Sequence, residues 1–454
     1  MGSNTCNHNK KKKNNNNNNK RSGSKKRMTH EQSLAYKSVS EWVFLDTDSC
    51  SPNSTISIDD NFKVKLVHTK ASSEKLVFEL HSHSICSDGF LSPSKLVEKA
   101  HQYGSLLPVC MYDIGLRNAN KDEQVKVLSL TDHDTMAGIP QAIEAARKVG
   151  IKIIPGVEIS TIFTPRTDTG SEEPVHVLAY YSSCGPSNFE KLDRFLANIR
   201  DGRYLRAKNM ISKLNKLKLP IRWENVEKIA GDGVAPGRLH VARAMVEAGH
   251  VENLKQAFSR YLYDGGPAYS TGSEPDVEEA VRLICETGGV AVLAHPWALK
   301  NPVAIIRRLK EAGLHGLEVY RSDGKLAAFS DLADTYDLLK LGGSDYHARG
   351  GSSESALGSV SLPMVAVHEF LKVARPIWCG AIKKTVDRYV TEPTESNLEH
   401  ILRYAKIKVV KGGAVSSITT RNIEIIHECL SQWLTNEEQK SFDFEAITHA
   451  EDKP

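Results

Sequence analysis

Short apolar runs alternate with amphipathic segments from about residue 75 onward. The runs at 76–80 (LVFEL), 125–130 (VKVLSL) and 151–160 (IKIIPGVEIS) are rich in β-branched and other apolar residues and predict strands. The segments 92–104 and 138–150 between them carry apolar residues at helical spacing, and each ends in glycine. This alternation of strand and helix is typical of a parallel α/β sheet or an α/β barrel.

Capping signals support the two helices. Ser92 suits the N-cap because its hydroxyl can accept a hydrogen bond from a free N–H of the first turn, and Pro93 suits the first helical position. Gly104 and Gly150 suit the left-handed position that often ends a helix. We therefore expect two helices with defined ends.

The strand–helix rhythm breaks after residues 174–181 (PVHVLAYY). Residues 189–217 have strong helical spacing, and two more helices are predicted at 238–250 and 253–262. Strand patterns then return in GGVAVLAHP, GLHGLEVY and LLKLGGSDYH. A helical insertion of roughly a hundred residues therefore interrupts a single α/β domain.

We divide the chain into five segments on this basis. They are a basic and polar extension without packed structure (1–74), the first part of the barrel (75–188), a helical insertion that acts as a substrate lid (189–285), the second part of the barrel (286–390) and a C-terminal extension (391–454). Residues 105–124 join a helix to a strand where a few residues usually suffice. We interpret them as a splice or gene-model insertion, or as a tolerated surface loop.

Charge is distributed unevenly along the 454 residues. Residues 1–27 hold nine Lys and Arg and no acid, so the net charge of +4 leaves about −5 on the remaining chain. The folded part is thus not a generally basic surface, which argues against processive work on long nucleic acids. The basic tail is predicted either to contact nucleic acid or an import receptor, or to remain solvated.

Two further absences narrow the class of protein. The eight cysteines form no CxxC pair, which fits a reducing compartment, the cytoplasm or the nucleus. No apolar run reaches the length of a membrane span, so we expect no membrane partner.

Histidines and carboxylates follow or lie within six predicted strands. Cys86 stands between His83 and Asp88, and we interpret it as a bystander rather than a thiolate ligand. In α/β folds, active sites are built at the edge where parallel strands end. Each residue alone has a simpler interpretation: His295 as a turn residue, Glu158 as a carboxylate near a helix start, His176 as a core histidine. Their common position favours a shared site instead. The candidates are His81, His83, Asp88, His133, Glu158, His176, His295, Asp345 and His347.

These residue types predict a metal centre. Imidazole and carboxylate without thiolate favour Mn²⁺, Fe²⁺, Zn²⁺ or Mg²⁺ over a structural zinc site. Nine ligands are too many for one ion, so we expect two or three divalent ions, with Mn²⁺ first among them. Clustered divalent ions suit phosphoester hydrolysis, since they can generate a hydroxide and neutralise the attacking and leaving oxygens.

The motifs HSHSICSDG, LTDHDTMAG, GVEIS, HVLAY, AHP and GGSDYH, in this order, resemble the PHP (polymerase and histidinol phosphatase) superfamily over about residues 76–385. The resemblance implies a distorted (β/α)7 barrel with three metal ions. Asp88 stands where several relatives have histidine. The implied ligand sets are His81, His83, Glu158 and Asp345 for one ion, Glu158, His176 and His295 for the second, and Asp88, His133 and His347 for the third.

The insertion, with PGRLHVARAMVEAGHV and AFSRYLYDGGPAY, is similar to that of bacterial 3′,5′-nucleoside bisphosphate phosphatases. The resemblance implies removal of the 3′-phosphate from molecules such as 3′-phosphoadenosine 5′-phosphate, and 5′-to-3′ exoribonuclease activity on short RNA. Arg238 and His240 would contact substrate phosphate, although Arg238 could equally form a structural ion pair. The attacking hydroxide would be held by Glu158, His176, His295 and Asp345. Histidinol-phosphate hydrolysis and a non-catalytic scaffold are the alternatives.

Overall fold

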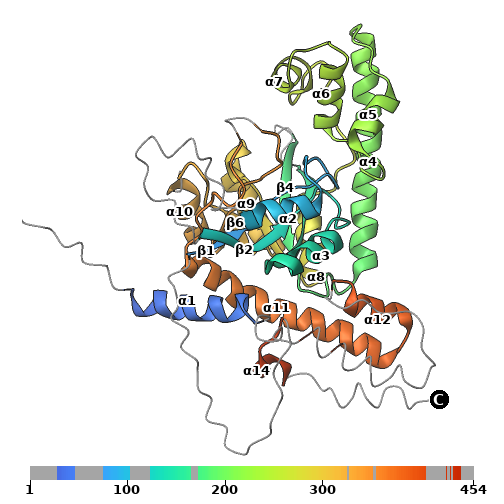
Figure 1. Cartoon of the computed structure of the whole chain (residues 1–454). Coiled ribbons are helices and arrows are strands. Elements are labelled where there is room, and N and C mark those ends of the chain that lie inside the picture. The colour runs from blue at the N-terminus through green and yellow to red at the C-terminus, as the bar shows by residue number, and fades with distance from the viewer. Residues whose placement is uncertain are drawn as a thin grey trace, which may run out of the picture.

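The computed structural model describes residues 28–45, 75–102, 123–164, 172–324, 327–350, 354–404, 426, 430 and 433–440. Seven strands form one curled sheet whose spatial order follows the sequence (Figure 1). This arrangement confirms the predicted α/β fold class. The strands are β1 (Lys75–Glu79), β2 (Glu123–Leu130), β3 (Lys152–Phe163), β4 (Glu173–Tyr180), β5 (Val290–Leu293), β6 (Gly316–Glu318) and β7 (Leu339–Leu341).

One strand runs against the others. The pairs β1–β2, β2–β3, β5–β6 and β6–β7 are parallel, whereas β4 is antiparallel to both β3 and β5. A bridge between Ser82 and Tyr346 joins the segments that follow β1 and β7. Six strands therefore end at one edge of the curled sheet, and the bridge draws the first and last of them together there.

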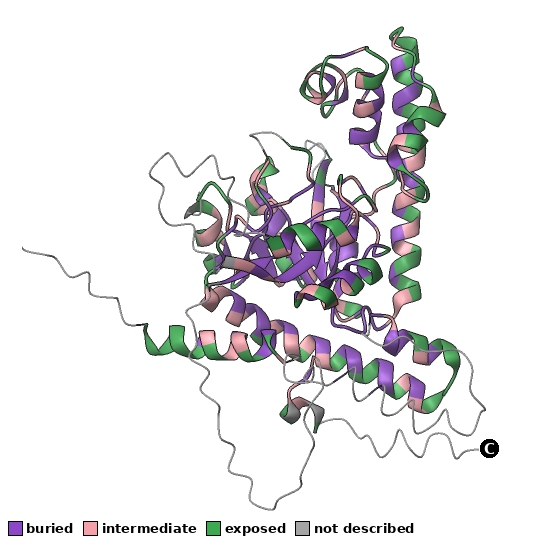
Figure 2. Cartoon of the chain, in the orientation of Figure 1, coloured by how far each residue is buried: buried purple, intermediate pink, exposed green. Residues whose placement is uncertain are grey.

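Helices cover the outer surface of the sheet, and the strands are almost entirely buried (Figure 2). The covering helices are α2 (Pro93–Gln102), α3 (Ile139–Val149), α8 (Val277–Glu286), α9 (Pro302–Ala312) and α10 (Ala327–Thr335). The predicted caps are present: Ser92 accepts a hydrogen bond from the Lys95 N–H at 3.3 Å, and Gly150 ends α3 with a φ of 70°. Gly104 lies outside the described residues.

One long helix, α4 (Phe189–Lys216), connects the barrel to the helical insertion. Leu192 and Leu196 in its first half belong to the barrel core, whereas Met210 and Leu214 belong to a separate apolar cluster. That second cluster is completed by α5 (Trp223–Ala230), α6 (Arg238–Glu247), α7 (Leu254–Ala257) and the π-helical turn η3 (Phe258–Leu262).

The insertion differs from its predicted bounds of 189–285 at both ends. Its start lies within α4, because the first half of that helix packs in the barrel core. Its end precedes α8, because α8 packs against β3, β4 and β5.

A helix also forms where we expected no packed structure before Lys75. Helix α1 (His30–Val43) begins with a capping box between Thr29 and Gln32 and buries Trp42 against α11 (Met364–Thr391). The short helices α12 (Glu395–Leu402) and α14 (Asn436–Gln439) follow α11. The basic tail 1–27 and most of the segment 105–124 lie outside the described residues. Within the described part of the chain, no helix has both the length and the apolar character of a membrane span.

Candidate metal centre

The nine candidate ligands meet at the edge where the parallel strands end. Three overlapping groups place their ligand atoms within 4.8 Å of one another. His295 adds to these through its contact with Glu158. The groups are His81, His83, Glu158 and Asp345; His83, Asp88, His133 and His347; and His133, Glu158 and His176.

The first group has the spacing of ligands around a single ion. The Nε2 atoms of His81 and His83 lie 3.1 Å apart. Each lies 3.1–3.3 Å from Glu158 Oε2 and from Asp345 Oδ1. Ligand atoms about 2.1 Å from an ion lie roughly 3.0 Å apart in an octahedron and roughly 3.4 Å apart in a tetrahedron. These four residues therefore fit a divalent cation without rearrangement.

A buried carboxylate supports this group from behind. Glu318 Oε1 lies 3.1 Å from His81 Nδ1, and Glu318 Oε2 accepts a hydrogen bond from the His295 N–H at 2.7 Å. A carboxylate on the second ring nitrogen is the usual partner of a metal-bound histidine, because it keeps the proton on that nitrogen. Glu318 was not among the predicted site residues, although it stands at the end of a strand, β6, as several of the candidate ligands do.

The second group contains polar atoms that need a partner. Asp88 Oδ1 and His347 Nε2 lie 3.2 Å apart, but their orientation forms no hydrogen bond. These two atoms and His83 Nδ1 are buried and lack a hydrogen-bond partner among the described residues. Because unpaired buried polar atoms are destabilising, their convergence fits a site built for a cation. Asp88 thus lies in one group with its histidine neighbours.

Glu158 connects two of the groups. Its Oε2 faces the first group, while its Oε1 lies 2.9 Å from His176 Nδ1 and 3.0 Å from His295 Nε2. This division of its oxygens suits a carboxylate that bridges two ions. Glu158 lies in the middle of β3 rather than at its end, and His176 lies near the start of the reversed strand β4. The reversal brings His176 to the same edge as the ends of the parallel strands.

The carboxylates of the cluster are held in their charged form. Burial raises the pKa of Asp88, but His347 and His133 outweigh burial and hold this pKa well below its usual range. The same balance between burial and neighbouring histidines lowers the pKa of Glu158 and of Asp345. Divalent ions need ionised carboxylates and neutral imidazoles, so metal binding would displace protons from the histidines.

The backbone is strained at this edge. Asp134, His295, Asp345 and Ala348 have φ values of 56°, 28°, 53° and 59°, a region that side chains other than glycine rarely adopt. Such conformations cluster at functional sites, where the surrounding structure holds them in place. Asp134 is held by an ion pair with Arg203 at 2.6 Å and by the Ser160 N–H at 2.7 Å.

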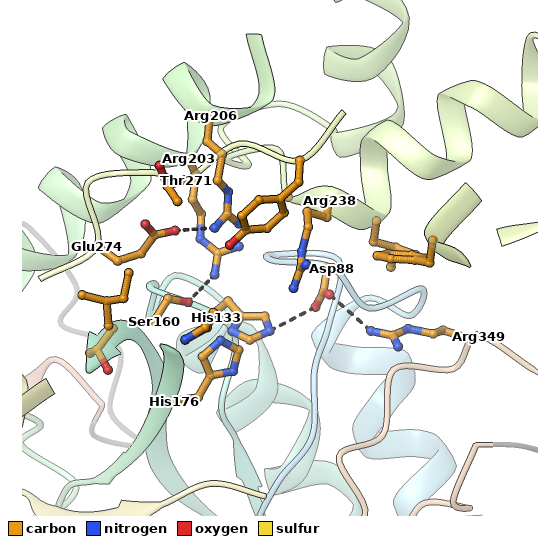
Figure 3. Close-up of a pocket in the computed structure, with 17 residues that line it drawn as sticks. Asp88, His133, Ser160, His176, Arg203, Arg206, Arg238, Thr271, Glu274 and Arg349 are labelled. Atoms are coloured by element: carbon orange, nitrogen blue, oxygen red, sulfur yellow. Dashed lines mark hydrogen bonds and ion pairs between the residues drawn. The ribbon is translucent and has the colours of Figure 1, made fainter. Parts of the chain in front are cut away.

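A cavity of about 200 Å³ adjoins the cluster and shares its wall. Asp88, His133 and His176 line it on the cluster side (Figure 3). Four arginines line its other walls, two from α4, one from the start of α6 and one from the segment after β7: Arg203, Arg206, Arg238 and Arg349. The cavity thus places guanidinium groups beside the candidate metal ligands.

The two residues predicted to contact substrate differ in their placement. Arg238 lines the cavity and also pairs with Asp264 at 2.5 Å, so both of its expected roles are compatible with the structure. His240 is buried, its Nδ1 accepts a hydrogen bond from the Gly237 N–H at 2.9 Å, and it is not among the lining residues. His240 therefore stabilises the start of α6.

Sequence analysis missed the other three arginines of the cavity. Arg203 donates to Ser160 Oγ at 2.5 Å in addition to its ion pair, and Arg206 pairs with Glu274. The two residues are three apart on α4 and therefore share one face of that helix. Arg349 pairs with Asp88 at 3.3 Å. The spacing of Arg203 and Arg206 indicates a shared helix face, but exposed arginines on a helix have the same spacing.

Comparison with known proteins places the chain in a family. The model of the PHP domain matches residues 116–229. A 5′-3′ exoribonuclease of Haemophilus influenzae is 32% identical over 281 residues, which cover 60% of this chain and 89% of that protein. A 3′,5′-nucleoside bisphosphate phosphatase of Chromobacterium violaceum is 30% identical, over 66% of this chain and 94% of that protein.

A solved structure agrees with these relatives. It comes from Bifidobacterium adolescentis, is described as a metal-dependent phosphoesterase, and has a TM-score of 0.52 at 28% identity, covering 65% of this chain and 95% of its own. The similarity thus spans nearly the whole of each relative. The chain belongs to the PHP domain family and is a metal-dependent phosphoric ester hydrolase.

Proposed function

We propose that this enzyme removes the 3′-phosphate from nucleoside 3′,5′-bisphosphates such as 3′-phosphoadenosine 5′-phosphate, and that it also acts on short 5′-phosphorylated RNA. The observation that carries the proposal is the shared wall between the ligand cluster and the arginine-lined cavity. A substrate with two phosphates needs one site for the reacting phosphate and a second site for the other.

The nine cluster residues would hold two or three divalent ions in this proposal, with Mn²⁺ as the first expectation. Such ions supply Lewis-acid polarisation of the phosphoryl oxygens, charge neutralisation and activation of water at neutral pH. Glu318 fixes the orientation of His81 through its Nδ1 contact. Glu158 holds His176 and His295 at fixed separation through a single oxygen.

The arginines are proposed to bind the phosphate that does not react. A guanidinium has five N–H donors in a planar fork that matches phosphate oxygens, so an arginine can pair with a carboxylate and still donate to a ligand. Arg203 and Arg206 approach the cavity from α4, while Arg238 approaches from the start of α6. The insertion would thereby act as a lid that supplies part of the binding site.

Charge distinguishes this substrate from histidinol phosphate. That molecule carries a single phosphate and an ammonium group, and the ammonium would face the cavity arginines at a cost in electrostatic energy. A nucleoside bisphosphate instead carries a second anion at that position. The names of the Haemophilus and Chromobacterium relatives agree with a nucleotide or RNA substrate.

The proposal is tested by Mn²⁺-dependent phosphate release from 3′-phosphoadenosine 5′-phosphate, measured beside histidinol phosphate and a short 5′-phosphorylated RNA. We expect fast, chelator-sensitive release from the bisphosphate and slow release from histidinol phosphate. His81→Ala should lose bound metal and activity while keeping its helical content. A folded, metal-loaded enzyme that hydrolyses none of the three substrates would instead favour the non-catalytic scaffold.

A further inference from the structure

The insertion carries a second groove on its surface. It is formed on α4 and the start of α5 and is open to solvent. We call it the α4–α5 groove; its residues are Lys208, Ile211, Ser212, Asn215, Lys216 and Trp223. No member of this set belongs to the cavity beside the metal cluster.

The chemistry of the groove favours an anion that carries an aromatic ring. The Lys208 ammonium lies over the Trp223 ring, 4.9 Å from its centroid, and Lys216 lies on the same wall. Ser212 and Asn215 add polar groups, and no carboxylate lines the groove. Aromatic rings beside cations are how proteins hold single-stranded nucleic acids without reading their sequence, because every base has a π-face.

Charge connects the groove to the cavity. Residues 202–223 contain seven Lys and Arg and no Asp or Glu. Arg206 lines the cavity, and the Lys213 ammonium contacts the backbone oxygen of Tyr269, another cavity residue. Lys216 follows one helical turn later and lies in the groove. At 3.6 residues per turn, Arg206 and Lys213 share one side of α4, and Lys216 lies about 80° further around the helix. Lys213 and Lys216 therefore lead from the cavity side of α4 to the edge of the groove.

The length of this path corresponds to a few nucleotides. Ten residues separate Arg206 from Lys216, which is about 15 Å along a helix at 1.5 Å per residue. At roughly 3.4 Å per stacked nucleotide, about four nucleotides would span that distance. A mononucleotide or dinucleotide in the cavity would not reach the groove, whereas an oligonucleotide would.

We propose that the α4–α5 groove binds the distal nucleotides of a short single-stranded RNA whose end lies in the cavity. This inference rests on the proposed function, since it assumes that the cavity accepts a nucleotide end. The groove would distinguish oligonucleotides from mononucleotides through affinity and would leave the chemistry of the metal cluster unchanged. Trp223 would stack on a base, and Lys208 and Lys216 would contact phosphates.

The test compares binding of a cleavage-resistant, 5′-phosphorylated RNA octamer with that of the matching dinucleotide. We expect the octamer to bind the full-length protein at least about tenfold more tightly, as stacking and phosphate contacts beyond the cavity require. The double variant Lys208→Gln/Lys216→Gln should weaken octamer binding roughly 5- to 10-fold. It should also lower the slope of log affinity against log salt by about 1.4, at 0.7 per lost phosphate contact.

A matched control removes the same charge elsewhere on the insertion. Lys228 and Lys255 are exposed and lie outside the groove, so Lys228→Gln/Lys255→Gln should leave octamer affinity within about twofold. Dinucleotide binding and phosphate release from the bisphosphate should stay unchanged in both double variants. Trp223→Leu, which keeps an apolar side chain, should weaken binding of the octamer and leave binding of the dinucleotide unchanged.

Three results would overturn the inference: equal affinity for octamer and dinucleotide, equal effects of the two double variants, or displacement of the octamer by an acidic peptide of equal charge. The last would indicate a protein partner instead. Hydrolysis of the bisphosphate in the same preparations separates the two proposals. If the bisphosphate is not hydrolysed but octamer binding still depends on the groove residues, the proposed function is refuted and RNA binding at the groove is retained.

Discussion

Replacing Glu318 by glutamine tests whether the cluster is a metal site, because it removes one acceptor without changing shape. Glu318 uses both oxygens as acceptors, one facing His81 Nδ1 at 3.1 Å and the other bonded to the His295 N–H at 2.7 Å. A glutamine has one oxygen and one NH₂ group, so it can accept only one of these two bonds. Whichever bond is kept, the other partner meets a donor.

Each outcome for Glu318→Gln weakens metal binding. If the glutamine oxygen stays with the His295 N–H, its NH₂ faces His81 Nδ1, and His81 must carry its proton on Nε2, the nitrogen that would bind the ion. If the oxygen turns to His81, the strained backbone at His295 loses its acceptor. Loss of such a supporting carboxylate typically lowers metal affinity 10- to 100-fold, about 1.4–2.7 kcal/mol.

The assay is Mn²⁺ affinity by competition with a chelator, together with activity as a function of Mn²⁺ concentration. Activity of Glu318→Gln should recover largely at high Mn²⁺, since the nine ligands remain. Glu173→Gln serves as the control, because Glu173 is also buried and also accepts a backbone N–H, from Lys300, but lies outside the ligand groups. Metal affinity within twofold of the unmodified protein, in a folded variant, would refute the role given to Glu318.

Three further predictions concern the site and its supports. In Gly343→Ala the new Cβ would lie 2.4 Å from His81 Cβ, so metal affinity should fall at least about tenfold by chelator competition, whereas Gly380→Ala, with nothing within 4 Å, should not change it. Trp42→Ala should lower the free energy of unfolding by roughly 3–5 kcal/mol in urea without changing kcat, whereas Leu34→Ala, 52% exposed, should stay within about 0.5 kcal/mol. Burial lowers the pKa of His240 to about 4, so the unfolded state binds its proton first and stability falls as the pH drops from about 6.5 towards 4. Between pH 7 and 4.5, the free energy of unfolding should fall by roughly 2.5 kcal/mol less in His240→Gln than in the unmodified protein. An equal fall in both proteins would contradict this role of His240.

The ligand cluster could be predicted because its signal is local and its geometry follows from topology. A histidine or carboxylate directly after an apolar run is visible in the sequence, and parallel strands bring such residues to one edge. His81, His83 and Asp345 follow that rule. His176 does not, because β4 is reversed, and its arrival at the same edge depended on a strand direction that periodicity does not reveal.

The cavity could not be predicted in the same way. Arg203 and Arg206 have the sequence pattern of solvated helical residues, and their function depends on where α4 lies relative to the barrel. Glu318 has the same strand-end signal as the ligands, but its role becomes clear only from the two bonds it accepts. Such supporting and contact residues are defined by tertiary packing, which local patterns do not encode.

Helix α1 shows how a compositional argument can hide a real element. The surrounding extension is polar and low in complexity, which argues against packing. Thr29 and Gln32 nevertheless form a capping box, and Val39 and Trp42 provide a small apolar stripe that α11 covers. The partner surface on α11 comes more than three hundred residues later, so the stabilising contact is absent from any local window.

The net charge of the chain also hides a local feature, the basic stretch on α4. This stretch bears on the choice of substrate. The chain beyond residue 27 is acidic on average, yet residues 202–223 are wholly basic among their charged side chains. One continuous helix carries Leu196 in the barrel core, Arg203 in the cavity and Lys216 in the α4–α5 groove. Because an uninterrupted helix is stiff, the groove and the cavity keep a fixed separation. A fixed separation selects ligands by length, so the balance between mononucleotide and oligonucleotide substrates should depend on α4 rather than on the metal cluster.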